Sequence, residues 1–463
     1  MKNYNYKILL ACLILVILHL HLLLYVSFVD HPYPIGDSWR YIRLHLEPLY
    51  AGDYEIGMLW GPLHPNPLRV VLLFVNAKFL DLNFKYELIC GIIFRIIISI
   101  VLMYNFIKSQ KKVSLCWTIV VLLLSLSFAT SSQFTWSILA TANIHYFLAI
   151  IYFLIFSKVI NRYYGQNDVG YLLSVFAAYA TIFIVLNKDI AILAICSTLF
   201  LTVIFYLSHR ERFMLALWLI QGLVLMVAIS LLKNISYYQS RNRISIIQAI
   251  EGFSQNIENF ITTTLISVTS SFIPIMKYNA NTLKLSSIVG ICLLVVYLYY
   301  VVLYVIRKMW RYDVFPLCLI VFSSLFYLAC CWNRYLPESG ARWNSVPHRY
   351  FIAYQLAGIG LVWIVAALSS DRKAVVLNMT KVIVLLVCIS IEGNFVVDRW
   401  KGLKYVNRSR EIYTDKLYRQ AAGQIPFEKY HRVYGYNNAY DDLVFLKNNN
   451  LSLFNKDEGH LVR

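Results

Sequence analysis

Residues 8–28 read ILLACLILVILHLHLLLYVSF, an uncharged and largely apolar run. A transmembrane helix needs about 20 mostly apolar residues. The run is too long for the core of a signal peptide and lacks a small-residue cleavage site, so it predicts a retained membrane anchor. Ten further apolar stretches follow, at 86–107, 113–130, 143–160, 169–186, 190–207, 214–232, 285–306, 314–332, 349–368 and 379–396. The sequence therefore predicts an all-α polytopic membrane protein with about 11 transmembrane helices.

The composition favours the same class. Hydrophobic residues make up 59% of the 463 residues and charged residues 14%, whereas an average soluble domain has about 45–50% and about 25%. The net charge of +18 is spread along apolar segments and is not gathered on one face, unlike in a nucleic-acid binder. Water-soluble enzymes, disordered regulators and nucleic-acid-binding proteins are excluded.

The charges between the spans predict an orientation, because Lys and Arg collect in short cytoplasmic loops. With a cytoplasmic N-terminus, the inner segments hold thirteen basic and four acidic residues, whereas the first outer loop, 30–67, holds five acidic residues and two arginines. The C-terminus then lies outside. The predicted regions are a membrane domain at 1–396 and an outer C-terminal region at 397–463, in which Asp441 and Asp442 start a helix.

Two apolar segments are predicted to lie in the outer membrane interface without crossing the bilayer. Residues 67–83 are too few for a full span. Residues 257–276 carry an apolar helical stripe with Ser and Thr on the other face, the pattern of an interfacial helix. If either segment crosses, the C-terminal region moves to the cytoplasm. The polar residues otherwise gather on the outer side, in 30–67, 233–284, 333–348 and 397–463.

The first outer loop contains a candidate catalytic carboxylate. Asp37 follows Gly36 and precedes Ser38-Trp39, where a helix can start. It is therefore either an N-cap or a carboxylate at the level of lipid headgroups, where it could accept a proton from a sugar hydroxyl. The three acidic residues that follow Asp37 in this loop are predicted to be solvated surface charges (Glu47, Asp53 and Glu55).

Two outer segments contain candidate anion-binding residues. His64 and Arg69 flank prolines that fix an extended chain; they form either a rigid corner or a pair at the headgroup plane, where a guanidinium can bind phosphate bidentately. The second segment, 333–349, gathers four potential cations beside the single acid Glu338. It is either an interfacial anchor or an anion site (Arg334, Arg342, His348 and Arg349).

Two short outer turns add further candidates. Trp136 could stack on a sugar or belong to an aromatic belt at the membrane interface. Lys188 is a candidate substrate-binding cation, unless it pairs with the adjacent Asp189. The chain has no Walker loop, Rossmann glycine pattern, zinc-binding helix or serine nucleophile elbow, and its first outer loop has no Asp-x-Asp pair. No metal and no cofactor are predicted.

The chain carries an ordered set of short motifs. These are Asp37-Ser38-Trp39, His64-Pro-Asn-Pro-Leu-Arg69 before a short helix, a Ser/Gln/Trp turn ending at Trp136, an Arg-Tyr pair at Arg349-Tyr350, and FLKNNNLSLF at 445–454. In this order the chain resembles the polytopic GT-C glycosyltransferases of bacterial inner membranes. It is most similar in style to the phage-type glucosyltransferases that modify O-antigen and so convert serotype.

The resemblance implies a GT-C-like bundle and a hexose transfer, with glucose as the expected sugar. The donor would be a polyprenyl-phosphate sugar, and the acceptor O-antigen or a related surface polysaccharide on the periplasmic side. A companion flippase and a sugar-lipid synthase would supply the donor. The expected catalytic residue is a carboxylate of the first outer loop, which is Asp37 or, nearer the membrane, Asp30. Gly36 stands where related enzymes have the first of two adjacent acids.

The chemistry implied by this resemblance needs few groups. Polyprenyl phosphate is a reasonable leaving group, so the reaction needs a base for the acceptor hydroxyl and cations for the departing phosphate. Asp37 fits the base, and Arg342, Arg349 and Arg69 fit the stabilisation of charge on phosphate oxygens.

Two other functions remain open. A flippase for lipid-linked oligosaccharide would favour ionisable residues in mid-membrane and repeated halves, whereas His19, His21 and Arg95 are the few such residues noted, and no halfway repeat is evident. An O-antigen polymerase would be expected to carry key arginines in a large middle loop, and 233–284 contains Arg241 and Arg243.

Overall fold

A computed structural model of the chain describes residues 2–30, 33–35, 37–60, 66–110, 114–128, 137–165, 168–235, 251, 254–255, 257–275, 280–332, 351–369, 375–426 and 439–455. All the secondary structure found in these residues is helical. The predicted all-α class is therefore confirmed.

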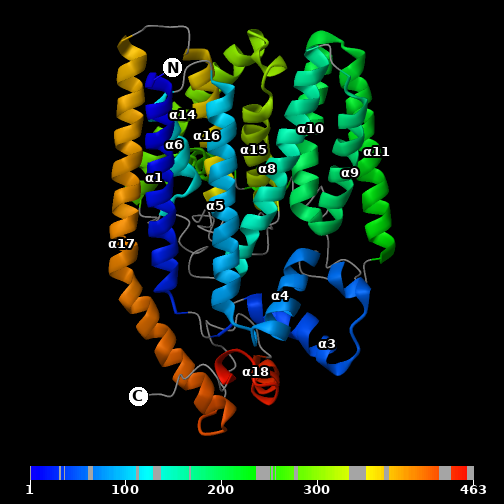
Figure 1. The fold of residues 1–463 in the computed structure, drawn as a ribbon, viewed down its shortest axis with the longest axis vertical. Helices are drawn as coiled ribbons and strands as arrows, with labels where there is room; N and C mark the ends of the chain where they lie inside the picture. The colour runs from blue at the N-terminus through cyan, green and yellow to red at the C-terminus, as the bar shows by residue number, and fades with distance from the viewer. Residues whose placement is uncertain are drawn as a thin grey trace.

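Long helices form an elongated bundle (Figure 1). They are α1 (Lys2–Ser27), α5 (Phe84–Ser109), α6 (Leu115–Ser125), α8 (Ser137–Tyr164), α9 (Gly170–Leu186), α10 (Lys188–His209), α11 (Arg212–Ile235), α13 (Ile257–Thr269), α14 (Ala280–Ile306), α15 (Phe315–Trp332), α16 (Phe351–Ser369) and α17 (Val375–Ala421), with the short η4 (Met309–Arg311) between α14 and α15.

Shorter helices gather at one end of the bundle, where α1 ends (Figure 1). They are α2 (Asp37–Tyr41), the π-helical η1 (Ile42–Leu46), α3 (Glu47–Ala51), η2 (Ile56–Trp60), α4 (Pro67–Phe79), α18 (Ala439–Asn448) and η6 (Ser452–Phe454). We call the described residues of 33–83, 411–426 and 439–455 the cap. Asp441 and Asp442 lie in the first turn of α18, as predicted.

Seven helices of the described chain are long and apolar enough to cross a membrane: α1, α5, α8, α10, α11, α14 and α16. This is compatible with a multi-pass membrane protein. The other four predicted spans coincide with α6, α9 and α15, which are apolar but shorter, and with α17, whose first part is apolar and whose second part is charged. That these four also cross the membrane stays a prediction.

Asparagine side chains define where three helices begin. Asn66 precedes Pro67 of α4, and its side-chain oxygen accepts the N–H of Arg69 at 3.3 Å. Asn83 caps α5 in the same way, through the N–H of Lys85 at 3.0 Å. Asn187 caps α10, through the N–H of Ile190 at 3.1 Å. Such caps satisfy N–H groups that the first helical turn leaves without a partner, so they fix the residue at which each helix starts.

The centre of the bundle is α16. Seventeen of its 19 residues are buried, and it packs against α15, α6 and α14. By contrast, α14 exposes much of its apolar surface, including Leu285 and Val295. An exposed apolar face of this kind is typical of a helix that contacts lipid.

The first and the last long helices lie side by side (Figure 1). Trp400 of α17 donates its indole N–H to His21 of α1 at 2.8 Å, and Asn407 donates to the carbonyl of Phe28 at 2.7 Å. α17 runs without a break from Val375 to Ala421. The boundary predicted between 396 and 397 therefore falls inside one helix, which continues from the bundle into the cap.

The predicted short segment 67–83 contains α4. The helix has 13 residues and is therefore about 20 Å long, which is short of the roughly 30 Å of a bilayer core. It lies at the cap end of the bundle (Figure 1) and packs against α5 and α9. Its position in the membrane interface stays a prediction.

The predicted amphipathic segment 257–276 contains α13, which turns its Ser and Thr side chains toward other helices. Thr269 donates to the carbonyl of Ser286 of α14 at 2.6 Å, and Tyr297 of α14 donates to Ser271 at 3.0 Å. Ile257 and Ile261 of the predicted apolar stripe are instead exposed. Ser and Thr between closely packed helices are common inside membranes; the interfacial position of α13 stays a prediction.

Candidate functional site

The cap has one hydrophobic core to which distant parts of the chain contribute. Trp39 and Ile42 of the first outer loop, Leu73 of α4 and Leu443 of α18 are fully or almost fully buried in it. The N–H of Ser452 also donates to the carbonyl of Asp81 at 2.7 Å. The predicted C-terminal region is therefore folded against the loop that carries the candidate acids.

Of the two candidate catalytic acids, Asp30 lies where α1 meets α17. Its backbone N–H donates to the side-chain oxygen of Asn407 at 3.2 Å, and its carbonyl accepts a hydrogen bond from Arg410. Asp30 is exposed, whereas Arg410 is buried, and burial lowers the pKa of this guanidinium, partly offset by the charges of Tyr33 and Asp30. Asp37 is the first residue of α2; its side-chain position lies outside the described part of the structure.

A second pair of acids in the cap joins the first outer loop to α18. Asp442 is fully buried and shares a hydrogen bond with Glu47. Burial, and then the hydrogen bond and charge of Glu47, raise the pKa of Asp442 to about 8, against the opposing charge of Arg43. Two carboxyl groups that share a site cannot both ionise easily, so the pair holds a proton at neutral pH.

The predicted phosphate ligand Arg69 lies at the junction of α4 with α8. It is buried, donates Nη1 to the hydroxyl of Thr141 at 3.0 Å, and places its guanidinium 4.3 Å from the centre of the Tyr41 ring. One turn further along α8, the ring Nε2 of His145 lies 2.5 Å from the side-chain nitrogen of Asn66. These contacts fix the start of α4 on α8.

The charge of Arg69 also reaches His45 of η1. The His45 ring bonds the Tyr54 hydroxyl at 3.0 Å through Nδ1. Burial, and then the positive charge of Arg69, lower the pKa of His45 to about 4. His45 is therefore neutral at physiological pH, whereas Arg69 near it is cationic.

A second polar cluster lies inside the bundle, where α6 ends after only 11 residues. Glu392 of α17 accepts the backbone N–H of Phe128 at 3.0 Å and a hydrogen bond from the Ser127 side chain. Backbone that leaves a helix inside a membrane must find such partners, because no water reaches it. Glu392 therefore holds the end of α6 in the bundle.

Arg95 of α5 belongs to the same cluster. Its exposed fraction is 0%, and it interacts electrostatically with Tyr146 of α8 and with Glu392. Among the described residues, none of its three guanidinium nitrogens has a hydrogen-bond partner. A charged group in this environment is costly unless it is paired, and in membrane proteins such groups are usually functional.

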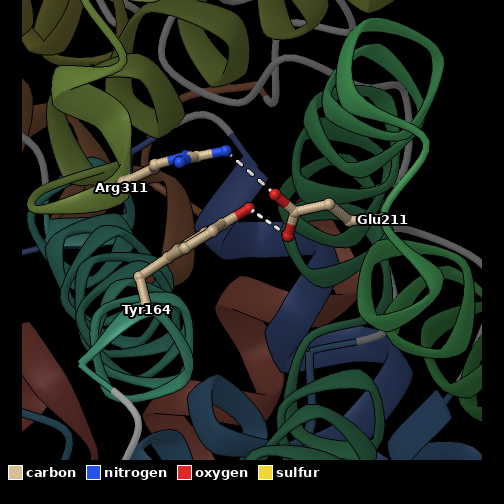
Figure 2. Close-up of polar contacts among 3 residues, drawn as sticks. All are labelled: Tyr164, Glu211 and Arg311. Carbon is tan, nitrogen blue, oxygen red and sulfur yellow. Dashed lines mark hydrogen bonds and ion pairs between the residues drawn. The ribbon is translucent and has the colours of Figure 1, made fainter.

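The opposite end of the bundle contains a paired network (Figure 2). Arg311 of η4 forms an ion pair with Glu211 at 2.9 Å, and the Tyr164 hydroxyl donates to the other Glu211 oxygen at 2.6 Å. Trp310 stacks on Phe205, with ring centres 3.9 Å apart. These contacts join α8, η4 and the turn between α10 and α11, so this network is structural.

The structure places some of the predicted site residues and not others. Asp30 and Arg69 lie in the contacts given above. Lys188 is the first residue of α10 and is half-buried, and the adjacent Asp189 lies close enough to His145 for electrostatic interaction. The other predicted site residues lie outside the described residues (His64, Trp136, Arg342, His348 and Arg349). The cationic pocket predicted at 333–349 is therefore not described.

Glu392 is the residue of the interior cluster that the sequence analysis did not single out. It is an acid inside a predicted span, 379–396, and Arg95 is a base inside another, 86–107. Opposite charges in two apolar spans are a signal for a buried polar cluster, and that signal was present in the sequence.

No group of three or more His, Cys, Asp or Glu side chains within the described ranges is arranged to hold a metal ion. The fold is all-helical in the described residues, with a cap at one end, and its long apolar helices are compatible with a multi-pass membrane protein. Comparisons with family models, with curated proteins and with solved structures gave no match.

Proposed function

We propose that the chain is a glycosyltransferase of the GT-C type in the bacterial inner membrane. It moves a hexose, with glucose as the expected sugar, from a polyprenyl-phosphate donor to O-antigen or a related surface polysaccharide. The distribution of Lys and Arg predicts a cytoplasmic N-terminus, and 11 spans then put the cap and the C-terminus in the periplasm. Its partners are the donor lipid, the polysaccharide, the bilayer, and the companion flippase and sugar-lipid synthase.

One observation carries this proposal: the acidic first outer loop, α4 and the C-terminal helix share one core and are fixed on the bundle through Arg69 and Thr141. A rigid cap with acids next to the membrane suits a reaction between a lipid-linked donor and a water-borne acceptor. A transporter has no evident need for it.

The proposed reaction is a displacement at the anomeric carbon. The acceptor hydroxyl oxygen bonds to this carbon while the bond from carbon to phosphate oxygen breaks, and polyprenyl phosphate leaves with the electron pair. A carboxylate takes the hydroxyl proton. Asp37 is the preferred base, because it stands in the Asp37-Ser38-Trp39 motif on which the resemblance rests; Asp30 is the alternative.

The decisive experiment compares the surface polysaccharide of cells with and without this gene, by mass spectrometry. One additional hexose per repeat unit is expected in the presence of the gene. In Asp37→Asn this hexose should be lost, since general-base catalysis contributes roughly 10²–10⁴-fold, while the protein still accumulates in the membrane.

The matched control is Asp53→Asn, which removes an exposed acid of the same loop and should leave transfer unchanged. A loss of only a few-fold in Asp37→Asn would exclude Asp37 as the base. A reporter fused after Arg463 should be active in the periplasm, and activity restricted to the cytoplasm would contradict the proposed orientation.

A flippase for lipid-linked oligosaccharide is the second candidate, because Arg95 and Glu392 place charges inside the bundle as a transporter would. In that case cells without the gene should accumulate lipid-linked units. An O-antigen polymerase would instead shorten the polysaccharide when lost; its candidate arginines, Arg241 and Arg243, lie outside the described residues.

A further inference from the structure

Three buried side chains at or near the interior cluster have polar atoms without a hydrogen-bond partner among the described residues. They are the three guanidinium nitrogens of Arg95, Oδ1 of Asn143 and both amide atoms of Gln355. The exposed fractions of the three residues are 0%, 0% and 1%. Buried polar groups are almost always satisfied in folded proteins, so three such groups in one region indicate a binding partner.

Arg95 and Asn143 lie next to each other because α5 and α8 pack in register. Asn143 of α8 donates to the carbonyl of Gly91 at 3.2 Å, and Phe147 packs on Phe94 with ring centres 5.6 Å apart. Arg95 is one turn beyond Gly91 on α5, and therefore on the same side of the helix. Its guanidinium and the free oxygen of Asn143 belong to one interface.

Gln355 reaches this region from α16. It is one turn from Gly358, which lies so close to the end of α6 that an added Cβ would be 3.4 Å from Leu124. The next turn of the chain beyond Leu124 leads to Ser127 and Phe128, which Glu392 holds. Gln355 is therefore on the stretch of α16 that packs near the end of α6, which Glu392 holds.

Glu392 does not satisfy Arg95 in this arrangement. Its carboxylate is hydrogen-bonded to Phe128 and Ser127, so it offsets the charge of Arg95 at a distance and leaves the N–H donors free. The missing partner needs several acceptor oxygens, and anionic oxygens suit a guanidinium best. It must also enter an apolar bundle, which a lipid does and a free ion does not.

We propose that Arg95 binds the phosphate of a polyprenyl-phosphate lipid inside the bundle, and that Asn143 and Gln355 bind the polar groups next to that phosphate. This inference rests on the proposed function, since it assigns a site to the donor. All three side chains are buried in this structure.

The test measures lipid binding to the purified full-length protein in zwitterionic nanodiscs by native mass spectrometry. The probes are a polyprenyl phosphate, the polyprenol without phosphate, and inorganic phosphate. The protein should prefer the polyprenyl phosphate over the polyprenol, and Arg95→Gln should weaken its binding by about 10- to 100-fold, the range expected for one charged hydrogen-bonding group. Arg95→Lys should restore part of the loss.

Arg212→Gln is the matched control, because Arg212 is exposed at the end of the bundle away from the cap. Its replacement should leave the binding of polyprenyl phosphate unchanged. An Arg95→Gln protein that keeps the preference for phosphate would overturn the proposal. So would equal competition by inorganic phosphate at the lipid concentration, because the site would then take a free anion.

Glu392→Gln keeps the proposal testable if Arg95→Gln fails to fold. A glutamine retains hydrogen-bonding atoms for Phe128 and Ser127 but removes the negative charge beside the phosphate, so binding should strengthen at least threefold. Weaker binding in Glu392→Gln would show that Glu392 and Arg95 serve each other as a structural pair, and would overturn the assignment.

The inference and the proposed function fail in different ways. If the protein binds polyprenyl phosphate through Arg95 but the surface polysaccharide is the same with and without the gene, the site stands and the transferase proposal falls. If hexose transfer depends on Asp37 but lipid binding does not depend on Arg95, the transferase proposal stands and the lipid site at Arg95 falls.

Discussion

The two ends of the molecule use carboxylates in opposite ways. At the end away from the cap, Glu211 faces a cation, Arg311, and a hydroxyl donor, Tyr164 (Figure 2). In the cap, Asp442 faces another acid, Glu47, and holds a proton. An ion pair of the first kind stabilises the fold throughout the neutral pH range. A pair of acids depends on the proton between them, so the contact of Asp442 with Glu47 makes the stability of the cap depend on pH.

The largest effect should come from the hydrophobic core of the cap. Leu443→Ala removes a fully buried side chain of α18, and large-to-small changes of this type cost roughly 2–5 kcal/mol. Limited proteolysis of the purified protein should show earlier cleavage in the cap, while the bundle stays intact.

The control for this change is Leu285→Ala, which shortens an exposed side chain of α14 and should leave cap proteolysis unchanged. Equal sensitivity of the two variants would mean that the cap is not held by this core.

An intermediate effect is expected at the opposite end. Glu211→Ala leaves Arg311 without its ion-pair partner and Tyr164 without its acceptor, which should lower the free energy of unfolding by about 1–3 kcal/mol. Thermal unfolding in detergent measures it. Glu211→Gln keeps the hydrogen-bond acceptor and should lose less.

If the proposed function holds, sugar transfer per folded molecule should be unchanged in Glu211→Ala, because Glu211 lies far along the bundle from the cap. A variant with normal stability and impaired transfer would assign a functional role to this network and would remove the contrast between the two ends.

Per pH unit, the smallest effect is a change in the slope of stability with pH. The pKa of Asp442 is raised to about 8 in the folded protein, far above an ordinary Asp value, so the folded state binds the proton more tightly than the unfolded state does. Stability is then greatest at low pH and falls as the pH rises toward 8, by less than about 1.4 kcal/mol per pH unit.

Asp442→Asn cannot ionise and should flatten this slope between about pH 4 and pH 8. Cap proteolysis across this range measures it, with Asp441→Asn as the neighbouring control. A slope that persists in Asp442→Asn would place the titrating group elsewhere.

Much of the fold could be predicted from hydropathy, but the length of α17 could not. The apolar run of the predicted span ends near residue 396, whereas the helix continues to Ala421. No proline interrupts this part, and Lys, Arg and Glu are good helix formers, so the backbone stays helical where the apolar signal stops. A hydropathy profile locates the apolar part of a helix and not its end.

The contacts of α13 show a second limit. Its apolar stripe was predictable, but which of its residues face the protein was not. Ile257 and Ile261 are exposed, whereas Phe260, Val268 and Phe272 of the same stripe pack on the core, and Ser and Thr also pack between the helices. The periodicity alone does not distinguish these residues.

Single residues of the candidate site could be predicted from the sequence, but the contacts between them could not. Arg69 was identified from the prolines beside it, but its partner Thr141 is 72 residues away. Arg95 was noted as a charge within a span, while Glu392, almost 300 residues later, was not connected with it. Spacing along the chain reports on local geometry, whereas these pairs depend on how the helices pack.

The shared core of the cap has a consequence for synthesis of the chain. The ribosome adds about 400 residues between Trp39 and Leu443, which takes roughly 20–80 s at about 5–20 residues per second. During that interval the first loop is without the segment that covers its apolar side chains. A chain truncated before Leu443 would leave Trp39 and Ile42 without that cover.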